Sequence, residues 1–379
     1  KRVVVTGLGA LTPIGNTLQE YWDGLVNGKS GAAPITYYDT EKHKTKFACE
    51  IKNFNVEDFI DKKEVRRMDK FAQYAIVASD EAIKDAGISL ENVNKHRVGV
   101  IWGAGIGGLQ TFQDEVMNYA AGDGTPRFNP FFIPKMIADI APGHISMRNG
   151  FMGPNYTTVS ACASSANALV DAFNYIRLGM CDVIVSGGSE AAVTIAGMGG
   201  FNSMQALSTR NESPETASRP FDATRDGFVL GEGAGALVLE EYEHAIARGA
   251  KIYCEVGGGG FALGAGHADR TRISVFGEPQ RGAADEARAA FGGSHGLGLV
   301  RADARRLDHH IERSQQLAAE LGFNAQMRIA QAGLQPAGQR LIGEKRIEIH
   351  WCLGDADAVP LRRDGRMQIG QRLAVIEPG

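Results

Sequence analysis

The stretch TTVSACASSANAL, residues 157–169, places a single cysteine between two different local patterns. The β-branched residues Thr157–Val159 at its start are typical of a strand. From Leu169 onward, apolar residues recur at the i, i+3, i+4, i+7 spacing of a helix that reaches Leu178. Cys162 is therefore predicted to lie at a strand–helix joint, where it is either a small buried side chain or a nucleophile.

The predicted joint gives a physical reason to favour the nucleophile. A cysteine just ahead of a helix faces unpaired backbone N–H groups and the positive end of the helix dipole, and both stabilise a thiolate relative to a thiol. The same N–H groups can bind the oxyanion of a tetrahedral intermediate. The alanines and serines beside Cys162 would let an acyl substrate reach the sulfur. Nothing comparable surrounds Cys49, Cys181 or Cys254, which are interpreted as unreactive packing residues.

Short β-branched runs alternate with helical patterns through residues 1–250. The predicted strands are Arg2–Thr6, Arg97–Trp102, Tyr156–Ser160, Asp182–Ser186 and Ala234–Leu239. The predicted helices are Phe71–Ala86, Leu169–Leu178 and Glu240–Arg248. This alternation predicts an α/β fold in which helices pack on a largely parallel or mixed sheet.

The composition argues against several classes of protein. The 379 residues carry a formal net charge of −4, which argues against a nucleic-acid partner because such partners need a broadly basic face. The five cysteines form no CxxC pair, so we expect free thiols in the cytoplasm and neither disulfides nor a zinc site. The first residues lack the apolar run of a signal peptide, and no window approaches the roughly 18 apolar residues of a membrane span.

Glycine-rich stretches follow two of the predicted strands. Gly7 and Gly9 begin a dinucleotide-like pattern, but Thr12 stands where the third glycine belongs and Pro13 follows it. A tight turn is therefore favoured, and no nicotinamide cofactor is expected. The segment GAGIGG, residues 103–108, would allow its backbone to approach a ligand or another segment closely.

The character of the chain changes after about residue 255. Residues 1–250 contain 12 Lys and 11 Arg, whereas residues 251–379 contain 2 Lys and 15 Arg together with five of the nine histidines. Two regions are therefore predicted, residues 1–250 and residues 251–379. The second is either a domain of different history or the product of a change in reading frame near Gly260.

Several segments together resemble the β-ketoacyl-[acyl-carrier-protein] synthases, and most closely the type II elongating enzymes of bacterial fatty-acid synthesis. They are RVVVTGLGALTPIG, GAGIGG, NPFFIPKMIADIAPGHIS, TTVSACASSANAL and ALSTRNESPETASRPFDATRDGFVLGEGAGALVLEEYEHAIARGAKIY. The resemblance covers about residues 1–260. It implies a thiolase-like fold of two similar βαβαβαββ halves in five α-β-α-β-α layers, a homodimer, and chemistry without a metal or redox cofactor.

The resemblance also implies roles for individual residues. Cys162 matches the nucleophile that accepts an acyl chain from acyl-carrier protein, before a malonyl group is decarboxylated and condensed with it. Ile106 and Phe132 match positions beside the acyl pocket. The carrier protein, which bears both groups on phosphopantetheine, would dock on a basic cluster that is otherwise interpreted as a solvated surface. The members of this cluster are Lys62, Lys63, Arg66, Arg67 and Lys70.

The two histidines with which the family stabilises the enolate formed on decarboxylation lack their usual motifs here. The nearest matches are His295 in SHGLGL, without the Thr of His-Gly-Thr, and Lys345 with His350 in KRIEIHWCLG, without the Gly before the histidine. His309 and His310 are alternatives for the first, and solvent-exposed histidines are the default interpretation. A non-catalytic partner subunit of the same fold is therefore the alternative to an active synthase.

Overall fold

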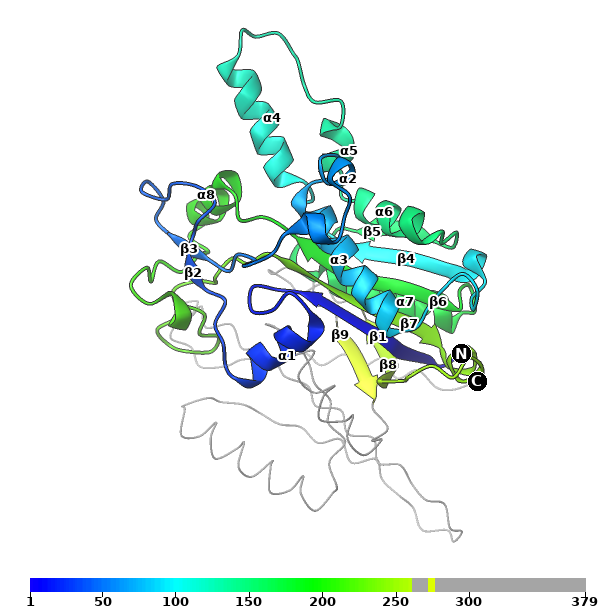
Figure 1. Ribbon diagram of the computed structural model, residues 1–379. Helices are drawn as coiled ribbons and strands as arrows, with labels where there is room; N and C mark the ends of the chain where they lie inside the picture. The colour runs from blue at the N-terminus through cyan, green and yellow to red at the C-terminus, as the bar shows by residue number, and fades with distance from the viewer. Residues whose placement is uncertain (261–271, 277–379) are drawn as a thin grey trace, which may run out of the picture. The chain divides into compact units, whose positions relative to one another are not determined.

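The computed structural model describes residues 1–260 and 272–276, all of which belong to the first of two compact units, Lys1–Arg301. This part is built on a seven-stranded mixed sheet in the order β5-β4-β6-β7-β1-β8-β9 (Figure 1). β4 pairs in parallel with β5 and β6, and the other neighbours are antiparallel. The strands are β1 (Val3–Leu11), β4 (Val98–Gly103), β5 (Asn155–Thr158), β6 (Val183–Glu190), β7 (Gly233–Glu241), β8 (Cys254–Gly260) and β9 (Arg272–Phe276). A separate two-stranded sheet joins β2 (Ala33–Pro34) and β3 (Phe47–Ala48).

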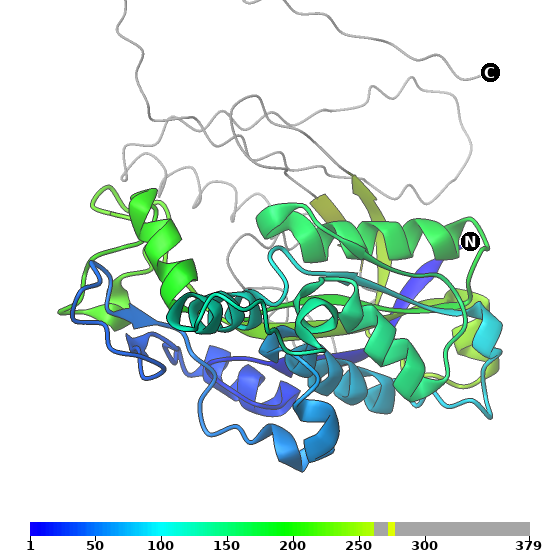
Figure 2. The same ribbon diagram turned by 90° about the horizontal axis from the view of Figure 1, so that it is seen from above.

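Helices cover both faces of the large sheet. The α-helices are α1 (Leu18–Val26), α2 (Lys62–Val65), α3 (Lys70–Asp85), α4 (Leu109–Ala121), α5 (Phe132–Met136), α6 (Ile140–Asn149), α7 (Ser164–Arg177), α8 (Ile195–Ser203) and α9 (Tyr242–Ala247). Short 3₁₀ helices lie at Val56–Asp58, Lys95–Arg97, Ala161–Ala163 and Pro214–Thr216. α3 and α6 pack on one face and α7 on the other, as Figure 2 shows for α3 in blue and α7 in green. The predicted α/β fold with a mixed sheet is confirmed for the described residues.

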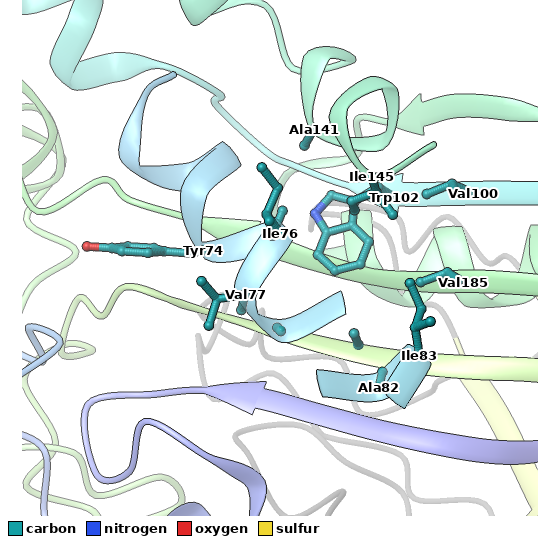
Figure 3. Close-up of a cluster of buried hydrophobic side chains, with 14 of the residues drawn as sticks. Tyr74, Ile76, Val77, Ala82, Ile83, Val100, Trp102, Ala141, Ile145 and Val185 are labelled. Carbon is teal, nitrogen blue, oxygen red and sulfur yellow. The ribbon is translucent and has the colours of Figure 1, made fainter. Parts of the chain in front are cut away.

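Alternation along the central strands produces a separate core on each face of the sheet. Trp102 of β4 faces α3 and α6, whereas the preceding Ile101 faces α7. Both side chains are fully buried. Figure 3 shows Trp102 beside Ile76 of α3 and Ile145 of α6. The central strands are therefore held from both sides, which fixes where their carboxyl ends lie.

All the predicted strands and helices are present, and β1 and β6 run several residues farther than predicted. Gly7 and Gly9 consequently lie inside β1, so the predicted tight turn is wrong. A Cβ at Gly7 would lie 2.2 Å from the carbonyl oxygen of Ala82, and one at Gly9 would lie 2.0 Å from that of Ala78. These two glycines let α3 lie directly against the strand.

A fully buried carboxylate, that of Glu240 in β7, joins β7 to β1 and α9. Arg248 donates to both of its oxygens at 2.7 Å, and Thr6 Oγ1 donates to Oε2 at 2.8 Å. The ring nitrogen Nδ1 of His244 lies 2.6 Å from Oε1. Burial by itself would raise the pKa of Glu240, but these hydrogen bonds outweigh it and leave that pKa below its usual range.

Replacing Arg248 by methionine is expected to lower the free energy of unfolding by about 3–5 kcal/mol, because Glu240 would remain buried without its main partner. Arg2→Met is the matched control. Arg2 also holds a carboxylate with two hydrogen bonds, to Glu255 at 2.9 and 2.6 Å, but on an exposed surface, so its loss should be several times smaller. Urea unfolding at neutral pH measures both variants. If the two variants lost the same free energy of unfolding, the burial of Glu240 would not strengthen its pairing with Arg248.

Candidate active site

Cys162 lies in the 3₁₀ turn Ala161–Ala163, between β5 and α7, which confirms the predicted strand–helix joint. It is exposed, whereas Cys181 and Cys254 are buried and Cys49 is half-buried. Burial raises the pKa of Cys181 and of Cys254 to about 11, so neither thiol ionises near neutral pH. Among the cysteines of residues 1–260, Cys162 alone combines exposure with a position at the start of a helix.

The residue before Cys162 has a strained backbone. Ala161 has a φ of 50°, in the left-handed region that residues other than glycine rarely adopt, which costs about 1–2 kcal/mol. The buried Ser164 holds this turn, because its hydroxyl donates to the Ala161 carbonyl oxygen at 2.7 Å and accepts the Ser160 N–H at 2.9 Å. The exposed Cys162 therefore lies on a turn whose conformation is fixed by its neighbours.

Two glycines let the start of α7 lie directly on the carboxyl ends of the parallel strands. Gly103 of β4 is in register with Thr158 of β5 and with Gly188 of β6. A Cβ at Gly103 would lie 2.3 Å from the backbone nitrogen of Ser165, and one at Gly188 would lie 2.6 Å from the Ser165 Cβ. Only glycine allows so close an approach. The carboxyl ends of parallel strands are also the edge at which open α/β sheets bind their ligands.

The first turn of α7 presents N–H groups that can stabilise an anion. Its N-cap residue is Ala163, which has no side-chain acceptor, and no side-chain cap hydrogen bond forms there. The helix has 14 residues, so the positive end of a full-length helix dipole lies beside Cys162. An oxyanion formed next to the Cys162 sulfur would be stabilised at this helix end.

The loop that carries Ile106 passes beside the cysteine turn. A Cβ at Gly105 would lie 3.2 Å from the carbonyl oxygen of Ala161. The carboxylate of Glu190 accepts the N–H groups of Gly105 at 2.7 Å and of Ile106 at 3.1 Å. Burial raises the pKa of Glu190, although the N–H groups of the loop act in the opposite direction. The only sign of Glu190 in the sequence is that an acidic residue ends the segment VIVSGGSE, which begins with three apolar residues.

The structure places the two predicted pocket residues on different elements. Ile106 is 45% exposed in the loop beside Cys162. Phe132 begins α5, where its ring stacks on those of Phe112 and Phe128 at centroid distances of 6.3 and 5.4 Å. α4 and α5 project together away from the sheet (Figure 1). Phe132 therefore lies on the projecting helices α4 and α5, whereas Ile106 lies in the loop beside Cys162.

The predicted docking cluster is only partly exposed. Its exposed members lie on α2 or directly after it and are Lys62, Lys63, Arg66 and Arg67. Lys62 lies 3.4 Å from Glu57, and the guanidinium of Arg67 lies 5.1 Å from the centre of the Phe131 ring. Lys70 differs, because its half-buried side chain places the ammonium 3.6 Å from the centre of a tyrosine ring. Lys70 is therefore not part of the exposed cluster.

Several predicted residues fall outside the described part of the chain. They are His295, His350 and Lys345, together with the alternatives His309 and His310. Among the residues that the structure describes, no three His, Cys, Asp or Glu side chains gather as metal ligands. No helix in this same part is long and apolar enough to cross a membrane.

An α/β unit with an exposed cysteine at the carboxyl edge of its parallel strands has an arrangement suited to nucleophilic catalysis. The chain belongs to the β-ketoacyl synthase family, since residues 1–245 match "Beta-ketoacyl synthase, N-terminal domain". The chain is 50% identical to the 3-oxoacyl-[acyl-carrier-protein] synthase 2 of Synechocystis sp. over 258 residues. This aligned region covers 68% of this chain and 62% of that protein. The chain thus spans less than two thirds of the length of this curated relative.

Solved structures show the same relationship. A β-ketoacyl synthase from Burkholderia phymatum has a TM-score of 0.64 at 33% identity, over 70% of this chain and 65% of that one. A chain of the AntDE:AntF structure, a type II PKS acyl-carrier protein in complex with its ketosynthase, has a TM-score of 0.57 at 26% identity, over 70% and 69%. The predicted thiolase-like class is confirmed, and most of the predicted second half, residues 251–379, lies outside the described residues.

Gly103→Ala is expected to lower the free energy of unfolding by about 2 kcal/mol or more, because its Cβ would overlap the backbone of Ser165 and displace α7. The matched control is Gly143→Ala. Gly143 lies inside α6 with nothing within 4 Å of an added Cβ, so this change should be neutral or stabilising by roughly 0.5–1 kcal/mol. Urea unfolding measures both. If Gly103→Ala unfolded at the same urea concentration as the wild type, the close contact between α7 and β4 would be contradicted.

Proposed function

We propose that the chain is an acyltransferase that uses Cys162 to condense an acyl thioester with malonyl-acyl-carrier protein, elongating fatty acids by two carbons. The observation that carries this proposal is the exposed Cys162 on a fixed turn at the start of α7, in a member of the β-ketoacyl synthase family. The name of the Synechocystis relative, 3-oxoacyl-[acyl-carrier-protein] synthase 2, supports this choice of reaction.

The proposed reaction consists of two exchanges at the Cys162 sulfur. The thiolate first attacks the carbonyl carbon of the acyl thioester, forms a new C–S bond and expels the phosphopantetheine thiolate, which takes up a proton. Loss of CO₂ from the malonyl group then leaves a carbanion, stabilised as its enolate, whose carbon attacks the Cys162 thioester. The C–C bond forms as the C–S bond to Cys162 breaks, so the thiolate is regenerated. N–H groups at the start of α7 would stabilise the oxyanion of each tetrahedral intermediate.

For decarboxylation, the family resemblance makes His295 and His350, with Lys345, our candidates. The neutral imidazoles of the two histidines would donate hydrogen bonds to the enolate oxygen. We propose that residues 1–250 form the half that carries the nucleophile and that residues 251–379 form a second half that departs from the family. The incomplete histidine motifs favour the alternatives, a non-catalytic partner subunit or a chain whose reading frame changes near Gly260.

Incubation of the full chain with a short acyl-carrier-protein thioester is expected to acylate Cys162, as seen by intact mass and peptide mapping. Cys162→Ala should abolish the adduct. Cys181→Ala should keep it, because the Cys181 thiol is buried and stays protonated. Addition of malonyl-acyl-carrier protein should then release CO₂ and a product that is two carbons longer.

The possible failures of this experiment have different meanings. An unmodified Cys162 would exclude the proposed nucleophile. Acylation without release of CO₂ would identify transfer without condensation, which the incomplete histidine motifs of a partner subunit would produce. Acylation that survives Cys162→Ala would place the chemistry at another residue.

We further propose that acyl-carrier protein docks on the exposed cluster formed by Lys62, Lys63, Arg66 and Arg67. Within the described residues, the only ion pair of this cluster joins Lys62 to Glu57, so most of its positive charge is available to a partner. Clustered charges of one sign attract an oppositely charged partner and orient it during encounter. The AntDE:AntF structure, in which a ketosynthase binds an acyl-carrier protein, supports this class of partner.

Replacing Lys63 and Arg66 together by glutamate is expected to weaken binding of acyl-carrier protein by at least about tenfold, and to reduce the salt dependence of binding. The matched control is Lys84→Glu with Lys95→Glu, two exposed lysines elsewhere whose reversal changes the net charge equally. Fluorescence anisotropy with labelled carrier protein at two ionic strengths measures both pairs. Equal weakening by the two pairs would assign the effect to net charge and not to the cluster.

We infer that the protein is a homodimer from the unpaired edge of the described sheet. We infer that it is cytoplasmic from its free thiols. In the described part, β5 is an edge strand that pairs only with β4. Large apolar side chains are exposed on and between α4 and α5: Phe112, Val116, Met117, Tyr119, Phe128, Phe131 and Ile133. An unpaired edge strand and an exposed apolar surface each support a homodimer. The free cysteines among residues 1–260 support a cytoplasmic location.

A further inference from the structure

Glu190, the last residue of β6, holds the backbone that carries Ile106. Its Oε2 atom accepts the N–H groups of Gly105 at 2.7 Å and of Ile106 at 3.1 Å. Its Oε1 atom is buried and has no hydrogen-bond partner among the described residues. Burying an unpaired carboxyl oxygen is unfavourable, because nothing replaces the water that it loses. The hydrogen bonds that this side chain does make all serve the loop.

A buried carboxylate, that of Asp69, holds the first turn of α4, the helix that follows the loop. Asp69 Oδ2 accepts the N–H of Thr111 at 2.9 Å and its hydroxyl at 2.6 Å. Between the two carboxylates, the N–H of Gly108 donates to the carbonyl oxygen of Met136 at 2.9 Å. The loop is therefore held at Gly105, Ile106 and Gly108, and the helix after it is held at Thr111, while the side chain of Ile106 is exposed.

The loop and the cysteine turn are in contact through their backbones. A Cβ at Gly105 would lie 3.2 Å from the carbonyl oxygen of Ala161, the residue before Cys162. With its backbone held, Ile106 can respond to a substrate only by rotating its side chain. If the backbone were released, the whole residue could move aside, and the site would discriminate less between short and long acyl chains.

We propose that Glu190 is a positioning residue that fixes the backbone of Ile106 and thereby sets the length of acyl chain that Cys162 accepts. This inference rests on the proposed function, because it assigns a substrate preference to the same cysteine. Glu190 touches no reacting atom and acts through the loop alone.

The test compares Glu190→Met with Glu190→Gln in the full chain. Methionine is similar in volume but removes the acceptor, whereas glutamine keeps one oxygen for the N–H groups of Gly105 and Ile106. One readout is hydrogen exchange of the amides in residues 103–108. The other is the ratio of the acylation rates of Cys162 with butyryl- and palmitoyl-acyl-carrier protein.

Glu190→Met is expected to speed exchange at Gly105 and Ile106 by at least about tenfold, and to bring the two acylation rates at least about fivefold closer together. The butyryl rate should stay within about twofold of wild type. Glu190→Gln should restore both the exchange and the ratio. Unchanged exchange in the methionine variant, or equal slowing with both acyl chains, would overturn the proposal.

The two readouts separate this proposal from the proposed function. If neither thioester acylates the wild-type chain, the proposed function and the chain-length preference fail together, while hydrogen exchange still shows whether Glu190 holds the loop. If the methionine variant does not fold, hydrogen exchange of the wild-type amides provides the test. Exchange at Gly105 and Ile106 as fast as in the exposed residues 122–126 would then overturn the proposal, and protection relative to them would support it.

Discussion

The close contact between the start of α7 and the ends of β4 and β6 determines the geometry of the candidate site. Because Gly103 and Gly188 have no side chains, the backbone of Ser165 lies against the strands, and Cys162 is held three residues earlier at their edge. The chain must then turn sharply between β5 and α7, and Ala161 adopts a left-handed conformation to do so. Burial of α7 in the second core stabilises the strained turn, so the packing of the sheet positions the cysteine.

Three carboxylates in this part of the chain, two of them buried and that of Glu190 half-buried, differ in how fully they are paired. Glu240 has donors on both oxygens and joins strands to a helix. Asp69 receives hydrogen bonds on both oxygens, from Thr111 and from the first turn of α3. Glu190 keeps one oxygen unpaired. Fully paired carboxylates thus stabilise the frame, whereas the incompletely paired one lies beside the cysteine turn, where a change in a few hydrogen bonds alters a loop and not the whole fold.

Strands β1, β4, β5, β6 and β7, helices α3, α7 and α9, and the position of Cys162 could be predicted because they depend on local patterns. The β-branched run before Cys162 and the apolar spacing after it sufficed to place the joint. A Gly-x-Gly pattern, by contrast, is typical of both a turn and a close helix contact, and only the position of α3 decides between them at Gly7 and Gly9. The prediction there failed for this reason.

Contacts between distant segments left no local signal. Glu190 binds Gly105 across 85 residues, and no spacing rule links the two. Lys63 and Lys70 belong to the same basic run of the sequence. Lys63 lies on α2 and is exposed, whereas Lys70 begins α3 and its ammonium lies against an aromatic ring. The assignments of His295 and His350 stay predictions, since they come from resemblance and fall outside the described residues.

The most direct test of Cys162 as the nucleophile is a crystal structure of the full chain after reaction with a short acyl-carrier-protein thioester. We expect a thioester on the Cys162 sulfur, with its carbonyl oxygen within hydrogen-bonding distance of backbone N–H groups at the start of α7. Ser165 should still lie against Gly103. An acyl group on another residue, or a Cys162 thioester that points away from the helix end, would contradict the assignment.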